Sequence, residues 1–313
     1  MNDGCENIVI RTALILKEYM INTILIIGIG KLGSLLAGSL YGKIGRLWLL
    51  DSSPEAIASL PEEIKLNSEM YSKLDELTEL PDIIIISVND SAISKVQLEL
   101  SVIFGKKLEG KLVIHCSGAM TVDILDDCRK AGAEIAAVHP YQTLFYQRNE
   151  VLEGVRWGVE CSEESKESIS QLISLIGGIP IYLNQIDAAK KALYHCSAVA
   201  ASNFLTINLA LASEIAQKAN ISAAEFFPPI IRTTIENNLE AILDNKPPPL
   251  TGPFARGDIE TVKLHIEALR SEPALLKIYC YLSLAAAEIS LRNGMLDENS
   301  HFQLSKLLKE SII

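Results

Sequence analysis

The chain has 313 residues, 49 % of them hydrophobic, and a formal net charge of -11. This length leaves room for two domains with substantial cores. The negative charge is spread without basic runs, which disfavours nucleic acid and anionic membranes as partners. We therefore expect the partner to be a small molecule.

The cysteines and the N-terminus predict a cytoplasmic protein. No CxxC spacing occurs, which favours a reducing compartment, packing roles and no metal site for Cys5, Cys116, Cys128, Cys161, Cys196 and Cys280. No window holds about 18 uninterrupted apolar residues, and Asp3 and Glu6 are unlike the basic start of a signal peptide. We expect residues 1–19, which precede a second methionine, to be a leader outside the core fold.

Short β-branched runs alternate with helix-like stretches from Asn22 to Ile181, a pattern typical of right-handed crossovers on a parallel sheet. The predicted strands are 23–27, 47–50, 83–88, 112–115, 135–138, 156–160 and 179–182. This predicts a doubly wound α/β domain of the Rossmann type over residues 20–186.

After Asp187 the hydrophobic pattern changes to long Ala/Leu-rich segments in which apolar residues recur with a period near 3.6 residues. Helices are predicted at 187–219, 222–244, 258–270, 273–293 and 299–310. We expect an all-helical domain for substrate binding and dimerisation over residues 187–313.

The first predicted strand runs into a GxGxxG motif formed by Gly28, Ile29, Gly30, Lys31, Leu32 and Gly33. In this setting the first glycine permits a tight turn, the second lets the backbone approach a pyrophosphate, and the third lets helix and strand pack closely. The free N–H groups of the helix N-terminus favour phosphates. The motif predicts a dinucleotide site, although a chance glycine turn would have the same sequence.

Asp51 ends the second predicted strand about 20 residues after the glycines, the position of a carboxylate that binds an adenosine ribose. Ser52 and Ser53 follow and could contact a ribose or its phosphate, so NAD and NADP both remain open. Asp51 could instead help Ser53 and Pro54 to begin a helix.

Ligands of open α/β sheets lie outside the carboxyl ends of the strands. Three later strands have polar endings. The third ends in Ser87, Val88 and Asn89, the fourth in His115, Cys116 and Ser117, and the fifth in His139, Pro140 and Tyr141. Either histidine could donate a proton or orient a carbonyl oxygen near the nicotinamide. Alternatively, each could simply hydrogen-bond a loop.

The helix predicted over 187–219 carries Lys191, His195, Ala198, Ser202 and Thr206 along one stripe. Lys191 and His195 are one turn apart, so together they could meet one substrate oxygen. Asn203 lies about 80° away on this wheel and would reach the site from its edge. The stripe could also be an ordinary solvated face.

The segment LTGPFARGD supplies a second C-terminal candidate. Arg256 could clamp a carboxylate or phosphate, with Thr251 beside it. Alternatively, Asp258 caps the next helix and Arg256 pairs with it.

Five segments occur in an order that resembles bacterial two-domain proteins labelled NADP oxidoreductases: GIGKLG, HCSGA, HPYQT, YHCSAVAASN and TGPFARGD. Those proteins have a Rossmann-like domain followed by a helical domain of unknown function, and the likeness covers nearly all of residues 20–312. The layout is more distantly similar to 6-phosphogluconate dehydrogenase, 3-hydroxyisobutyrate dehydrogenase, ketopantoate reductase and pyrroline-5-carboxylate reductase. There the helical domain pairs subunits and closes over the nicotinamide, which implies a homodimer.

The hydroxyacid dehydrogenases carry a catalytic lysine on their first long C-terminal helix and an asparagine one turn later. Lys191 matches the lysine, but His195 stands at the partner position. The glycine-rich turn before that lysine is replaced by residues 185–187. The resemblance therefore implies fold and cofactor more strongly than reaction.

We predict an oxidoreductase that moves hydride between NADP or NAD and a small carbonyl, imine or hydroxy acid. Lys191 or His195 would transfer the proton, and Arg256 would bind an anionic group. A non-catalytic dinucleotide sensor is the alternative and would need only the glycine turn. A fold that has lost dinucleotide binding is disfavoured by the intact glycines and Asp51.

Overall fold

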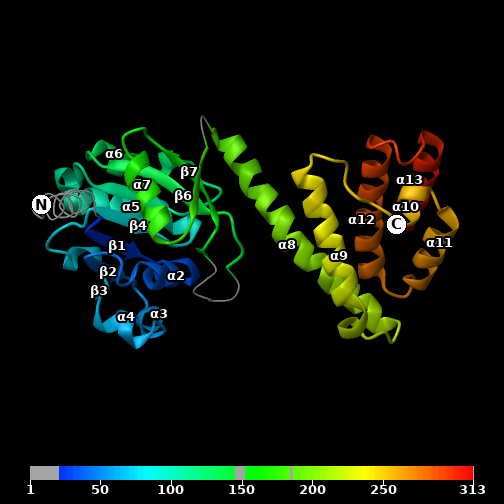
Figure 1. The fold of residues 1–313 in the computed structure, drawn as a ribbon, viewed down its shortest axis with the longest axis horizontal. Helices are drawn as coiled ribbons and strands as arrows, with labels where there is room; N and C mark the ends of the chain where they lie inside the picture. The colour runs from blue at the N-terminus through cyan, green and yellow to red at the C-terminus, as the bar shows by residue number, and fades with distance from the viewer. Residues whose placement is uncertain (1–20, 145–151, 184–185, 313) are drawn as a thin grey trace, which may run out of the picture. The chain divides into compact units, whose positions relative to one another are not determined.

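The computed structural model describes residues 21–144, 152–183 and 186–312; the leader predicted at 1–19 lies outside them. The chain divides into two compact units, Met1–Asn203 and Phe204–Ile313. The division falls inside helix α8 (Ala188–Lys218), so the first half of this helix belongs to the first unit (Figure 1).

Within the described part of the first unit, eight strands form one sheet in the order β3-β2-β1-β4-β5-β6-β7-β8. The strands are β1 (Thr23–Ile27), β2 (Arg46–Leu50), β3 (Glu69–Tyr71), β4 (Ile83–Ile86), β5 (Leu112–His115), β6 (Glu134–Pro140), β7 (Arg156–Cys161) and β8 (Ile179–Tyr182). The predicted α/β fold of the Rossmann type is confirmed, since β1 to β6 pair in parallel on both sides of β1.

The sheet differs from the predicted one at two places. Strand β7 pairs antiparallel to β6, because no helix of the described residues intervenes to make a crossover. Strand β3 was not predicted, since it has only three residues and an unpatterned sequence, Glu-Met-Tyr. Both differences lie away from the central strands that carry the glycine turn.

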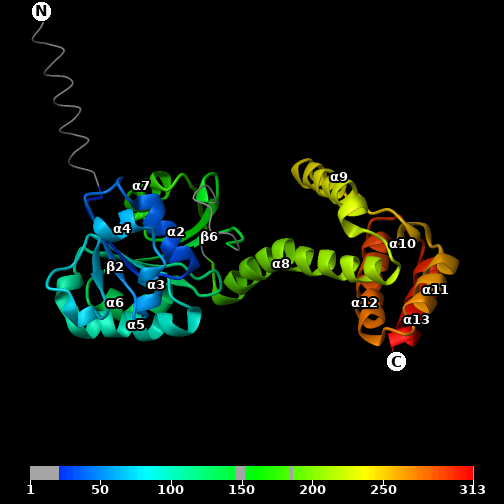
Figure 2. The same cartoon turned by 90° about the horizontal axis from the view of Figure 1, so that it is seen from below.

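Two helical layers cover the sheet (Figure 2). Helices α2 (Lys31–Leu40) and α7 (Lys166–Leu175) pack on the face that contains Ile24 and Ile26. Helices α5 (Asp90–Phe104) and α6 (Asp126–Lys130) pack on the face of Leu25. Because alternate residues of β1 enter both cores, the continuous apolar runs of the sequence are explained. The remaining helical elements are α3 (Pro54–Ala58), α4 (Glu62–Leu66) and the 3₁₀ turns Leu74–Glu76, Gly105–Leu108 and Val122–Leu125.

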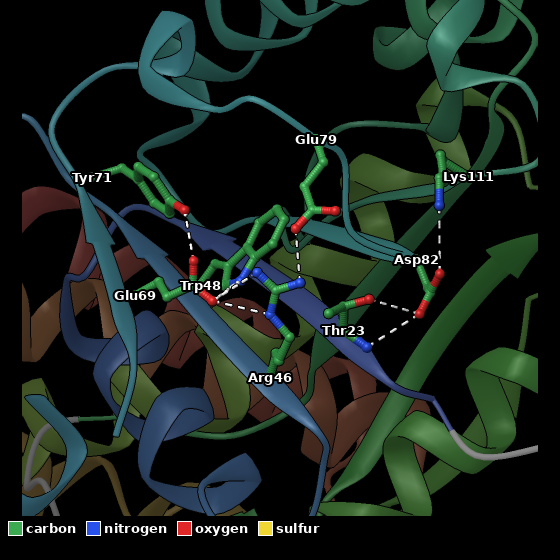
Figure 3. A network of polar contacts seen from close by, with 8 residues as sticks. All are labelled: Thr23, Arg46, Trp48, Glu69, Tyr71, Glu79, Asp82 and Lys111. Atoms are coloured by element: carbon green, nitrogen blue, oxygen red, sulfur yellow. Dashed lines mark hydrogen bonds and ion pairs between the residues drawn. The ribbon is translucent and has the colours of Figure 1, made fainter. Parts of the chain in front are cut away.

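Polar contacts fasten the amino-terminal edge of the sheet, opposite the carboxyl edge (Figure 3). The Arg46 guanidinium donates to Glu69 at 2.8 Å and to Glu79 at 2.7 Å. One carboxylate oxygen of Asp82 accepts from the backbone N–H and the hydroxyl of Thr23, at 3.1 and 2.8 Å. These contacts join the starts of β1, β2 and β4 and leave the opposite edge available for ligands.

The second unit is helical, and the predicted helices of this region are present. They are α9 (Ala223–Leu243), α11 (Ile259–Ala268), α12 (Pro273–Arg292) and α13 (Glu298–Ile312), with a short α10 (Pro253–Arg256), for which no helix was predicted, inside the LTGPFARGD segment. Its core is formed by α11, α12 and α13 around Val262, Cys280 and Leu304. Helix α9 contributes no residue to this core and exposes Phe226, Ile230, Leu239, Ile242 and Leu243.

Two described helices, α8 and α12, are long and apolar enough to cross a membrane by length and composition alone. Their most apolar windows have a mean hydropathy of 1.4. Two such helices are weak evidence of a membrane span, because a buried core helix of a soluble protein or a signal sequence meets the same criterion.

Candidate functional site

The glycine turn after β1 has the geometry that the GxGxxG motif predicts. Gly28 has a φ of +93°, which favours glycine, and a β-carbon on Gly33 would lie 2.0 Å from the Gly28 carbonyl oxygen. A β-carbon on Gly30 would meet nothing within 4 Å. Gly30 also begins α2 without a side-chain cap. The helix N-terminus is therefore packed tightly on the turn while the space beside Gly30 stays open to a ligand.

A cavity of about 370 Å³ adjoins this turn at the carboxyl ends of β1 and β2. The predicted Asp51, Ser52 and Val88 line it together with Lys73 and Lys95. Its apolar wall comes from Leu50, Leu74, Ala92 and Val96. An apolar wall beside polar groups at this switch point of the sheet suits a nucleoside. Asn89 precedes α5 as its N-cap residue.

Asp51 holds the backbone of the turn. One carboxylate oxygen accepts from the Ile29 N–H at 2.6 Å, and the other accepts from the Ser53 N–H at 2.8 Å. The Ser53 hydroxyl in turn accepts from the Ala56 N–H at the start of α3. The helix-start alternative is therefore present, and Asp51 also lines the cavity.

His115 has the loop-fixing contacts that were the alternative to a catalytic role. It is fully buried; its Nε2–H donates to the Thr121 carbonyl at 3.1 Å and its Nδ1 accepts from the Ser117 N–H at 3.2 Å. Burial, together with the charge of Lys191, lowers the pKa of His115 to about 4. The Ser117 hydroxyl accepts from two backbone N–H groups of the following turn. The structure therefore gives both residues contacts that hold this turn.

His139 contacts the first half of α8. Its Nδ1 lies 3.0 Å from the Tyr194 hydroxyl, and its ring meets those of Tyr194 and His195 edge to face. Burial is the largest cause that lowers the pKa of His139 to about 4. The neighbouring His195 and Lys191 act in the same direction. At neutral pH His139 is therefore an uncharged imidazole.

His195 lies beside Gly118, in the turn after β5. A β-carbon on Gly118 would lie 2.7 Å from His195 Nδ1 and 2.7 Å from His139 Nε2, so only glycine leaves room for both rings. Among the described residues His195 Nδ1 is buried without a hydrogen-bond partner. Burying a polar nitrogen without a hydrogen-bond partner costs folding free energy, so His195 is a candidate for a functional role.

Lys191 lies in the interior, although the sequence predicted it on a ligand-facing stripe. Its side chain is 0 % exposed and its Nζ lies 3.4 Å from Glu160, whose side chain is 14 % exposed. Burial lowers the pKa of Lys191, opposed by the Glu160 carboxylate. The other Glu160 oxygen accepts from the Val122 N–H at 2.9 Å. Lys191 therefore ties α8 to β7 and does not reach a ligand surface in this structure.

A second cavity, of about 420 Å³, lies between the end of β6 and α8. His139, Tyr141, His195, Ser202 and Asn203 supply polar groups to its lining. The apolar part is formed by Leu144, Ala198, Val199 and Ala201. All of these residues belong to the first unit. The structure thus brings three predicted residues, His139, His195 and Asn203, into one cavity.

Two other predicted residues, Thr251 and Arg256, belong to the second unit. Arg256 ends α10, and Asp258 caps α11 by accepting from the Thr261 N–H at 3.1 Å. The cap that the alternative predicted is present, and pairing of Arg256 with Asp258 stays a prediction. The substrate-binding roles predicted for Arg256 and Thr251 stay predictions.

Two contact residues, Tyr194 and Glu160, were not singled out from the sequence, and Tyr141 was named only as part of a polar strand ending. Tyr141 donates to or accepts from the Ser197 hydroxyl at 2.7 Å. Tyr141 and Tyr194 do lie next to predicted histidines, within HPYQT and YHCSA. That adjacency was the available signal, but the pairing joins residues 55 positions apart and needs the fold.

The two buried histidines predict a pH-dependent stability. Their folded pKa values of about 4 lie below the usual 6.5, so the unfolded chain binds more protons between these values. The free energy of unfolding should therefore fall as the pH drops from 6.5 toward 4, by on the order of 3 kcal/mol per histidine. Urea unfolding across this range measures it, and His139→Gln should flatten part of the slope. An unchanged slope in that variant would contradict the assignment.

Two family models match the chain. A Rossmann-like domain matches residues 20–140, and a domain of unknown function, DUF2520, matches residues 155–286. The chain joins a Rossmann-like domain to a DUF2520 domain. The resemblance to two-domain proteins of this composition is therefore confirmed. No curated protein matches the sequence.

Solved structures share the fold. A Bacteroides fragilis protein provisionally named an NADP oxidoreductase is 24 % identical with a TM-score of 0.68, covering 85 % of this chain and 98 % of its own. A Thermotoga maritima protein is 20 % identical with a TM-score of 0.63, over 85 % and 99 % of the two chains. A reductive aminase from Aspergillus terreus, in complex with NADPH and ethyl-5-oxohexanoate, is 11 % identical with a TM-score of 0.57, over 94 % of each chain.

Proposed function

We propose that this protein is an NAD(P)-dependent oxidoreductase acting on a small carbonyl, imine or hydroxy acid. One observation carries the proposal: the glycine turn, open at Gly30, and the cavity of His139 and His195 occupy the same carboxyl edge of the sheet. Nucleotide sites and reaction centres of such sheets share that edge. The names of the structural neighbours, which are oxidoreductases, support the same class.

The residues present fit a nicotinamide dinucleotide. The amides at the start of α2 would hold the diphosphate beside Gly30, and the cavity next to Asp51 would hold the adenosine. Lys73 and Lys95 line this cavity together with Asp51, Asp75 and Glu99. A 2′-phosphate would have cationic partners there, and a plain ribose would have carboxylates to accept its hydroxyl protons. We therefore propose NADP or NAD as the cofactor.

The bound cofactor would supply or accept the hydride. In the reduction direction the substrate carbon gains that hydride and its oxygen or nitrogen gains a proton. His195 is the residue of the second cavity that we assign to this proton, since its ring lines the cavity and is backed by His139. The Asn203 amide, at the same lining, is assigned to hydrogen-bond the substrate.

Thermal shift with NAD, NADH, NADP and NADPH tests the cofactor first. A ligand at 100 times its dissociation constant stabilises a fold by about 2.7 kcal/mol. A panel of keto acids, aldehydes and imines, assayed by nicotinamide absorbance with the stabilising cofactor, then tests turnover. No stabilisation by any of the four would overturn the proposal, and stabilisation without turnover over the panel would favour the sensor.

We also propose a cytoplasmic homodimer that binds neither membrane nor nucleic acid. Helix α9 supports the dimer, because it exposes the large apolar side chains Phe226, Ile230, Leu239 and Ile242, which an interface would cover. The net charge of -11 supports the absence of nucleic acid. Light scattering after size exclusion should give twice the mass of one chain, and Ile230→Glu should reduce it.

A further inference from the structure

Tyr141 follows the last residue of β6 and lines the second cavity. Its backbone N–H donates to the Arg156 carbonyl of β7 at 2.9 Å. Its ring packs against the ring of Tyr194, with centroids 5.1 Å apart, and against that of His139 at 6.4 Å. Its hydroxyl oxygen lies 2.7 Å from the hydroxyl oxygen of Ser197 on α8. A polar group that packing and hydrogen bonds hold in this way is preorganised for a ligand.

The direction of the bond between the two hydroxyls follows from a second contact of Ser197. The Ser197 hydroxyl donates to the Tyr194 carbonyl, one turn earlier in α8, at 2.7 Å. A carbonyl oxygen can only accept, and a serine hydroxyl has a single proton. Because the Ser197 proton is used on Tyr194, Tyr141 donates its own proton to the Ser197 oxygen. Both distances are normal for O–H···O hydrogen bonds.

The Tyr141 oxygen is thereby left as a hydrogen-bond acceptor. A phenol hydroxyl that donates its proton keeps the lone pairs of its oxygen. Among the residues that the structure describes, Ser197 is the partner of the Tyr141 hydroxyl, and none of them donates to the Tyr141 oxygen. Since Tyr141 lines the cavity, this oxygen can accept a hydrogen bond from a ligand that binds there.

We propose that Ser197 fixes Tyr141 as an acceptor, and that Tyr141 selects substrates with an N–H or O–H donor beside the reacting carbon. This inference rests on the proposed function and narrows its substrate. An N–H imine or a secondary alcohol satisfies the Tyr141 oxygen, whereas a ketone or ester of the same shape brings a second acceptor against it. Two facing acceptors lose the hydrogen bonds that they made to water, which costs binding free energy. Tyr141 contacts the substrate in this assignment, and Ser197, which does not line the cavity, is a positioning residue.

Pairs of small ligands with nearly equal shape test for the donor. Butyrolactam has a ring N–H where butyrolactone has an oxygen, and cyclopentanol has an O–H where cyclopentanone has a carbonyl. The full chain is titrated with and without NADPH, and binding is followed by the methyl signals of Ala198 and Val199, which line the cavity. We expect roughly tenfold tighter binding of the donor in at least one pair. The pair that shows it identifies N–H or O–H as the group recognised. Equal affinities within both pairs, or no binding of either donor, would overturn the inference.

Variants of the two hydroxyl residues separate recognition from positioning. Tyr141→Phe keeps the ring and removes the acceptor, so the preference should disappear through weaker binding of the donor ligand. Ser197→Ala releases the Tyr141 proton, which can then be donated to the lactone or ketone oxygen, so the preference should disappear or reverse. Ser197→Thr should restore it, because a helical threonine hydroxyl also bonds the carbonyl three or four residues earlier. A wild-type preference in Tyr141→Phe or Ser197→Ala would refute the roles assigned to them.

The same helix offers a matched control. The Ser213 hydroxyl donates to the Leu209 carbonyl at 2.9 Å, so Ser213→Ala removes the same kind of helix bond at a residue that does not line the cavity. This variant should keep the wild-type preference. Its loss there would show that the helix bond itself sets the preference, which would contradict the role of Ser197. No stabilisation by any of the four dinucleotides would instead refute the proposed function and leave the preference measured without NADPH standing.

Discussion

Replacing Gly30 with alanine should lower the affinity for the dinucleotide by on the order of 100-fold and leave the free energy of unfolding unchanged. Gly30 has a φ of -77°, which any residue adopts, and its β-carbon would meet nothing within 4 Å. The added methyl group therefore costs the fold little. It would, however, occupy the space through which a diphosphate approaches the amides of α2. Fluorescence titration with NADPH and NADH measures the affinity, and urea unfolding measures the stability.

Alanine substitutions at two other glycines of the same helix, Gly33 and Gly38, are the controls for this result. Gly38→Ala should bind coenzyme like the wild type, since its β-carbon makes an ordinary contact with Ile64. Gly33→Ala should destabilise the first unit, because its β-carbon would lie 2.0 Å from the Gly28 oxygen. If Gly30→Ala bound coenzyme as tightly as Gly38→Ala, the glycine turn would not be the diphosphate site.

Removing the Lys191 ammonium should destabilise the first unit by about 3–5 kcal/mol, because Glu160 would lose its cation in a poorly solvated place. The pair lies at 3.4 Å with Lys191 fully buried. Lys191→Met and Glu160→Gln should each have this effect, and the double variant should recover part of it. Both tryptophans, Trp48 and Trp157, lie in the first unit, so their fluorescence during urea unfolding reports on that unit.

The neighbouring lysine is the control for this experiment. The Lys190 side chain is 66 % exposed, and its ion pair with Asp187 is long, at 4.0 Å. Lys190→Met should therefore change the free energy of unfolding by less than about 1 kcal/mol. A catalytic Lys191, as the sequence suggested, would give the opposite pattern in Lys191→Met. Stability would then stay near that of the wild type, while turnover would be lost.

The sequence predicted the central strands, the long helices and the glycine turn to within a few residues. These features are local: strands β1 and β4 are runs of apolar residues, Gly28 and Gly33 have a backbone and a packing reason within the motif, and Gly30 leaves open space beside the turn. Strand β3 was missed because three residues at a sheet edge carry no periodicity. The antiparallel β7 was missed because strand direction depends on the connection and not on the strand's own residues.

The helical wheel placed Lys191 and His195 on one stripe of α8, and both do face the first unit. The wheel could not show what that stripe meets. Lys191 meets Glu160 on β7 and becomes buried, whereas His195 meets the turn at Gly118 and lines a cavity. The difference arises because successive turns of α8 pack against different parts of the sheet, β7 at Lys191 and the turn after β5 at His195.

The amino-acid sequence by itself determined the fold class, the position of the turn open to a diphosphate, and the histidines available for chemistry, because periodicity and glycine placement act over a few residues. Only the tertiary structure decided which histidine is enclosed by loop contacts and which histidines line a cavity. That decision depends on Tyr194 reaching His139 across 55 residues and on Gly118 leaving room between two rings. Such contacts follow from how α8 packs on the sheet, and no local pattern encodes them.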